Sequence, residues 1–197
     1  MQESAAAYPA TLSVDYPDRD LNRLTSFFRI FMAIPIAIIL YLLAGRNAGN
    51  IWVALPTLLM LLFRQKYPRW WFDWNLAMTN FINRVSAYVY LLTDEYPSTD
   101  EEQSVHVAIT YPDARLDLNR WMPLVKWLLA VPHYVVLFFL GIGVLVSLIL
   151  AWFAILFTGR YPRGLFDFIV GVMRWNLRLS AYMALLATDR YPPFSLK

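Results

Sequence analysis

The chain has 197 residues, of which 59% are hydrophobic, 17% aromatic and only 16% charged. Soluble domains average about 45–50% apolar and about 25% charged residues, so this composition indicates a membrane protein. The absence of cysteine excludes disulfides, thiolate catalysis and cysteine-ligated zinc or iron–sulfur clusters. Seventeen basic and fourteen acidic residues give a net charge of +3, too small a bias to indicate a nucleic-acid partner.

The first half of the chain predicts a strand followed by three helices. Residues 1–7 have neither the basic start nor the apolar core of a signal peptide, and we expect them to be disordered. Apolar and polar residues alternate over 11–16, which predicts a short strand. The apolar segments 24–44 and 48–64 are candidate membrane spans. On a helix, segment 70–92 has one polar side and a tryptophan-rich side, which is typical of an amphipathic helix at the membrane interface.

The second half predicts the same order of elements. The run of 31 uncharged residues from 127 to 157 would make a helix of roughly 46 Å, longer than a hydrocarbon core of about 30 Å. We therefore expect Gly141-Ile142-Gly143 to fold the run into two spans, 121–140 and 143–158. An interfacial helix over 164–187 completes this half, and a strand over 105–111 precedes it.

Motifs that recur in the same order show an internal duplication into residues 8–100 and 101–197. The clearest pairs are Tyr16-Pro17-Asp18 with Tyr111-Pro112-Asp113, Lys66-Tyr67-Pro68-Arg69 with Arg160-Tyr161-Pro162-Arg163, and Thr93-Asp94 with Thr188-Asp189. Since an isolated pair of strands is only marginally stable, we expect the two strands to pair with each other across the repeats, or with a partner. The repeated Tyr-Pro pairs are expected to end elements, with the tyrosines in the headgroup zone.

The segments Leu124–His133, Gly159–Phe168 and Thr188–Phe194 resemble the bacterial DUF4389 family, whose function is unassigned. The second repeat matches closely and the first more loosely, with Ile36 in place of His133 and Ser98 in place of Pro193. The resemblance implies a small inner-membrane protein and implies no reaction.

The predicted fold is an all-α integral membrane protein with two parallel repeats. Each repeat has a short strand, a two-helix transmembrane hairpin and an interfacial amphipathic helix. With this topology all fourteen acidic residues and sixteen of the seventeen basic ones lie on one side, and Arg46 is the exception. Because basic loops stay in the cytoplasm, both termini are expected on the cytoplasmic side of a bacterial inner membrane. Re-entrant hairpins that do not cross fully are the alternative.

Three groups of polar residues are candidates for function. His133 falls within a span, where it could ligate a haem or pigment, relay a proton, or simply form a hydrogen bond to a carbonyl freed by Pro132 or to a neighbouring helix. Arg29 and Lys126 could reach lipid headgroups, or could pair with Asp73 and Asp167 as structural ion pairs.

The third group is a charged stripe shared by the two interfacial helices. It includes Arg84 in the first helix, and Arg174 and Arg178 in the second. The stripe could face water, bind the phosphates of anionic lipids, or bind carboxylates and carbonyls of a protein partner.

No nucleotide-binding loop, metalloprotease motif or nucleophile elbow is present. We therefore expect no cofactor, no metal and no enzymatic activity. The predicted function is a membrane scaffold or accessory subunit of a larger inner-membrane complex, with membrane lipids and other proteins as partners. A small transporter or channel, and a lipid-interacting enzyme, are the alternatives.

Overall fold

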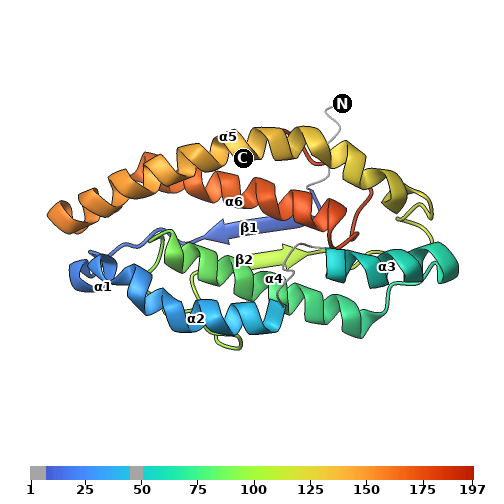
Figure 1. Cartoon of the computed structure of the whole chain (residues 1–197), viewed down its shortest axis with the longest axis horizontal. Coiled ribbons are helices and arrows are strands. Elements are labelled where there is room, and N and C mark those ends of the chain that lie inside the picture. Colours follow the sequence, from blue (N-terminus) through green and yellow to red (C-terminus); the bar gives the residue numbers. More distant parts are fainter. Residues whose placement is uncertain (1–7, 45–50) are drawn as a thin grey trace, which may run out of the picture.

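The computed structural model describes residues 8–44 and 51–197, which form two strands and six helices. In chain order these are β1 (Ala10–Val14), α1 (Arg23–Phe27), α2 (Arg29–Ala44), α3 (Ile51–Arg64), α4 (Arg69–Val89), β2 (Val105–Ile109), α5 (Met122–Thr158) and α6 (Arg163–Met183). The elements run along one long axis (Figure 1). In that view α5 lies at one edge and α2 at the other, with α6, the strands and much of α4 between them, and α3 lies at one end of the long axis.

The predicted hairpin of the second repeat is wrong. Met122–Thr158 is one helix of 37 residues, about 55 Å long, and Gly141 and Gly143 lie inside it. Two glycines cost a helix only about 1 kcal/mol each, and Gly-Ile-Gly has no polar side chain that would favour a turn. Of the helices in the described residues, this one alone is long and apolar enough to cross a membrane.

The first repeat also lacks the predicted hairpin of two spans. Its apolar helices α2 and α3 have 16 and 14 residues, and α3 lies beyond α2 along the long axis (Figure 1). The predicted turn around 45–50 and the predicted disorder of residues 1–7 lie outside the described residues. A multi-pass fold of transmembrane hairpins is therefore not supported, and the small sheet shows that the chain is not all-α.

A substitution at Gly141 tests whether α5 is continuous. An added Cβ at Gly141 meets no atom within 4 Å, so Gly141→Ala should raise the free energy of unfolding by up to about 1 kcal/mol. Gly159→Ala is the control, because Gly159 ends the helix with a φ of +76° and alanine there is strained by about 1–2 kcal/mol. Thermal unfolding in detergent measures both. A destabilised Gly141→Ala protein would indicate a turn inside α5.

Pairing of the two strands across the repeats is confirmed. β1 and β2 are antiparallel, in a register that places Ala10 opposite Ile109 and Val14 opposite Val105. Each strand packs against the amphipathic helix of the other repeat, β1 on α6 and β2 on α4. The inner face of the sheet is buried, whereas Thr11, Ser13 and His106 are exposed on its outer face.

Two tyrosines of the Tyr-Pro pairs are buried inside the protein, whereas Tyr96 and Tyr191 are 45% and 44% exposed. Tyr67 and Tyr161 are each 2% exposed, and their hydroxyls donate to the carbonyls of Leu185 and Tyr90 at 2.8 and 3.3 Å. Burial raises the pKa of both phenols well above the ordinary value. These tyrosines therefore join the two repeats through buried hydrogen bonds.

Candidate functional site

The predicted cations Arg29 and Lys126 occupy equivalent buried positions in the two repeats. They are 3% and 1% exposed, so neither side chain reaches out to lipid headgroups. Arg29 donates to the carbonyl of Thr93 and pairs with Asp94, the residue that follows. Lys126 Nζ donates to the carbonyl of Thr188 at 2.7 Å and lies 2.7 Å from Asp189 Oδ1.

The predicted pairing of these cations with Asp73 and Asp167 is wrong. Asp73 instead forms an exposed pair with Arg69, 3.1 Å away and one helical turn earlier, and Asp167 is exposed. The carboxylates that do pair, Asp94 and Asp189, also accept hydrogen bonds from the backbone N–H groups of Asn22 and Asn119. The repeated Thr-Asp motif was the sequence signal for these sites. It ties α2 to the segment after α4, and α5 to the segment after α6.

The charged stripe of the amphipathic helices binds the chain's own backbone. Arg174 donates to the carbonyls of Leu12 and Leu196, both at 3.1 Å, and Arg178 donates to those of Ser195 and Lys197. In the first repeat, Arg84 donates to the carbonyl of Ser98 at 2.8 Å.

Arg84 and Arg178 are 8% and 9% exposed, so the stripe is largely covered by protein. Burial, and then the nearby charge of Arg174, lower the pKa of the Arg178 guanidinium. The three arginines therefore hold the C-terminal segment, β1 and the segment after α4 in place.

His133 lies in a buried aromatic cluster. The indole Nε1 of Trp175 donates to His133 Nδ1 at 2.9 Å, so His133 has the predicted hydrogen bond to a neighbouring helix, here α6, in place of one to a carbonyl freed by Pro132. The ring of Phe194 stacks on the imidazole with centroids 4.1 Å apart, and the ring of Tyr191 lies 4.8 Å away. Among the described residues, no three His, Asp or Glu side chains come together in a way that could hold a metal ion. His133 therefore anchors the C-terminal segment to α5 and α6.

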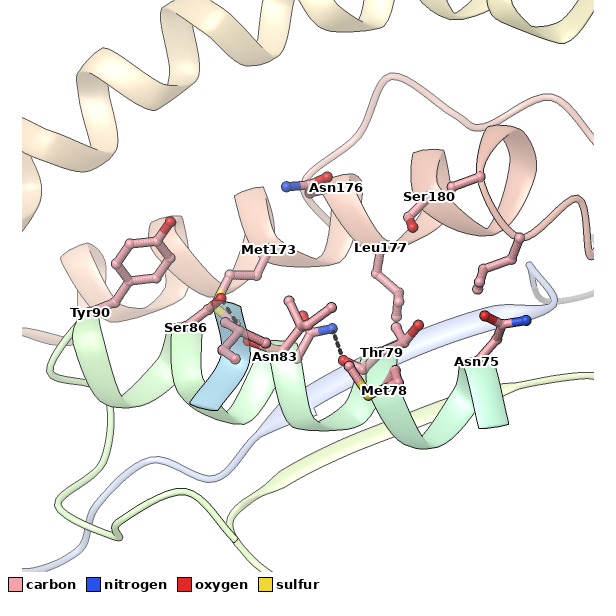
Figure 2. A pocket seen from close by; sticks show the side chains of 14 residues that line it. Asn75, Met78, Thr79, Asn83, Ser86, Tyr90, Met173, Asn176, Leu177 and Ser180 are labelled. Carbon is pink, nitrogen blue, oxygen red and sulfur yellow. Dashed lines mark hydrogen bonds between the residues drawn. The ribbon is translucent and has the colours of Figure 1, made fainter. Parts of the chain in front are cut away.

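Between α4 and α6 lies a groove of about 360 Å³, which the sequence did not predict (Figure 2). Seven polar side chains line it: Asn75, Thr79, Asn83, Ser86, Tyr90, Asn176 and Ser180. No charged side chain of the described residues lines this groove. The sequence predicts only that the polar residues of α4 share one side of an interfacial helix. One signal could have distinguished a groove from a water-facing surface. The polar residues of α4 that line the groove are all uncharged, although charged residues lie elsewhere on the same helix.

The outer helices present an almost continuous apolar surface. Along α5 the exposed side chains include Trp127, Val131, Val135, Phe138, Phe139, Ile142, Leu145, Ile149 and Phe153. Along α2 they include Ile30, Phe31, Ile34, Ile38 and Leu42, and α3 adds Leu55, Leu59 and Phe63. Exposed apolar surfaces of this extent mark membrane or protein contacts, because a monomer in water rarely tolerates them.

Comparison with protein families shows that the chain belongs to the family described as a domain of unknown function, DUF4389. The family model matches twice, over residues 23–99 and 120–195, which agrees with the internal duplication. Both matches begin after the strands, so they cover the helices and omit β1 and β2. Comparison with curated proteins and with solved structures finds no match.

Proposed function

We propose that the protein is a non-enzymatic membrane scaffold or accessory subunit that inserts the outer faces of α2, α3 and α5 into a lipid bilayer. The apolar surface of these helices is the observation that supports this function most directly. Its side chains are exposed from end to end of a helix about 55 Å long, and lipid tails are the environment that such a surface favours.

The long axis lies in the plane of the membrane in this proposal. The sheet is located midway along that axis (Figure 1), and its outer face carries the exposed pair of His106 Nε2 with Asp15 Oδ2 at 3.1 Å. If α5 crossed the bilayer upright, this pair and the exposed Thr11 and Ser13 would lie at the depth of the hydrocarbon. A charged side chain there costs about 2.5–3.5 kcal/mol. An in-plane orientation leaves the sheet in water.

We place the protein on the cytoplasmic leaflet of a bacterial inner membrane, as the family resemblance implies. Exposed basic side chains lie near the ends of the apolar helices: Arg64 at the end of α3 and Lys66 after it, Arg120 before α5 and Arg160 after it. Each basic side chain near an anionic surface contributes about 1 kcal/mol to membrane binding, so phosphatidylglycerol-type lipids are the expected partners. The water-facing sheet is then available to a protein partner of the same complex.

Labelling of single cysteines tests the orientation, because the chain has no cysteine of its own. Cysteines that replace Arg120 and Thr158 mark the two ends of α5, and Phe138→Cys marks its exposed middle. In oriented membrane vesicles, an impermeant maleimide should label both ends from the cytoplasmic side only. The middle should react only after detergent is added. Ends that label from opposite sides would show that α5 crosses the membrane, and a protein that fails to float with vesicles would contradict membrane insertion itself.

A further inference from the structure

The groove between α4 and α6 opens on the side away from the sheet. Met173 and Leu177 line the groove and also belong to the core that the inner face of the sheet covers. None of the described strand residues lines the groove, whereas Leu40 of α2 does. With the outer helices in the bilayer, which rests on the proposed function, the groove therefore faces the lipid.

The α4 side of the groove presents hydrogen-bond acceptors. The amide nitrogens of Asn75 and Asn83 donate to the carbonyls of Trp71 and Thr79, one turn earlier in the helix, both at 2.8 Å. Because only a nitrogen can donate to a carbonyl, each amide oxygen is left available as an acceptor. The Ser86 hydroxyl is used in the same way, on the carbonyl of Ile82 at 2.8 Å. A ligand that fits this wall must supply donors such as hydroxyl groups.

The α6 side of the groove is apolar at two of the equivalent positions. Met173 and Leu177 correspond to Thr79 and Asn83 in the aligned repeats, and both are buried. The groove thus combines a row of polar side chains on α4 with an apolar patch on α6, beside which Asn176 and Ser180 add two further polar groups. Its volume of about 360 Å³ lies at the lower end of the range for small-molecule sites, roughly 300–1,000 Å³.

We propose that this groove binds the uncharged, hydroxyl-bearing end of a membrane lipid of the diacylglycerol type. The hydroxyl and glycerol region contacts the oxygens of Asn75 and Asn83, and the first part of the acyl chains lies against Met173 and Leu177. A phosphate headgroup is disfavoured, because it would enter a groove with no arginine or lysine among its described lining residues and would lose its hydration without a countercharge.

A matched pair of probes tests the ligand class. Purified full-length protein in nanodiscs or detergent micelles is irradiated with a photoactivatable diacylglycerol, or with the phosphatidic acid that has the same chains. We expect the diacylglycerol probe to label groove peptides of α4 and α6, unlabelled diacylglycerol to compete, and the phosphatidic acid to label these peptides much less. Equal labelling by the two probes, or labelling confined to the outer faces of α2 and α5, would overturn the proposal.

A variant of the groove is made by giving α4 the residues that α6 has at two equivalent positions. Thr79→Met with Asn83→Leu replaces the Asn83 acceptor and the hydroxyl of Thr79 by the residues that α6 has at the same positions, and it should lower diacylglycerol labelling about tenfold. Thr11→Met with Ser13→Leu, on the outer face of the sheet, is the control and should leave labelling unchanged. Unchanged labelling in the groove variant, or a change in its oligomeric state that shows a second copy in the groove, would overturn the proposal.

Flotation with vesicles, measured on the same proteins, separates this proposal from the proposed function. A protein that floats but shows no competed labelling in the groove contradicts the lipid site alone. A protein that does not float, yet is labelled in micelles at α4 and α6, contradicts membrane insertion alone. If the groove variant does not fold, the positions at which the diacylglycerol probe labels the unsubstituted protein still test the proposal.

Discussion

Asp189→Ala should lower the free energy of unfolding by about 3–5 kcal/mol, the largest effect that we expect from one substitution. The side chain of Lys126 is 1% exposed, and without Asp189 its charge would remain buried with only the carbonyl of Thr188 and the ring of Tyr182 beside it. The variant also loses the carboxylate that accepts from the N–H of Asn119. Urea or thermal unfolding in detergent, followed by tryptophan fluorescence, measures the loss.

Two further variants show whether the buried charge is the cause. Asp73→Ala removes the exposed pair with Arg69, and such pairs contribute only about 0–1 kcal/mol. Lys126→Met added to Asp189→Ala removes the stranded cation and should recover part of the stability. Equal losses for Asp73→Ala and Asp189→Ala would contradict the assignment.

The second large effect concerns the hydrogen bond between Trp175 and His133. In the first repeat the equivalent residues are Phe81 and Ile36, which are buried against each other. Among the described residues, Trp175 is the only hydrogen-bond partner of the fully buried His133 imidazole. Trp175→Phe removes this bond and should lower the free energy of unfolding by about 1–3 kcal/mol. His133→Ile leaves the indole N–H without its partner and should cost a similar amount.

The double substitution recreates the pair of the first repeat. The double variant should lose less free energy of unfolding than the two single variants together, by about 1 kcal/mol or more, because neither polar group is then left without a hydrogen-bond partner. Unfolding measurements on all four proteins give this coupling energy. Strictly additive costs would show that packing, and not the hydrogen bond, stabilises the cluster.

The parts of the fold that the sequence predicted are those with a local signal. Alternation over residues 11–16 and 105–111 marked the strands, and the duplication correctly indicated that they pair with each other. Amphipathic patterns located α4 and α6, although the predicted helices ran three or four residues too far. Leu91 and Leu186 adopt φ values of 63° and 55° shortly after these helices end, which no sequence pattern indicated.

The predictions that failed depended on contacts between distant segments. Asp94 and Asp189 lie 65 and 63 residues from their cations, whereas the helical positions of Asp73 and Asp167 made them seem the natural partners. The length of an apolar run likewise does not say whether it bends. For 122–158, the expectation that the run must fit the thickness of a bilayer led to a hairpin, whereas the helix continues along α6.

The exchange of strands between the repeats has a consequence for any chain that contains one repeat. A lone repeat would leave its amphipathic helix without the strand that covers it, because that strand comes from the other repeat. It could complete its core only by association with a second molecule, so its folding would depend on concentration. In this chain the two repeats are covalently joined, which replaces that dependence by a local effective concentration of about millimolar. The fusion thus makes folding independent of the level of expression.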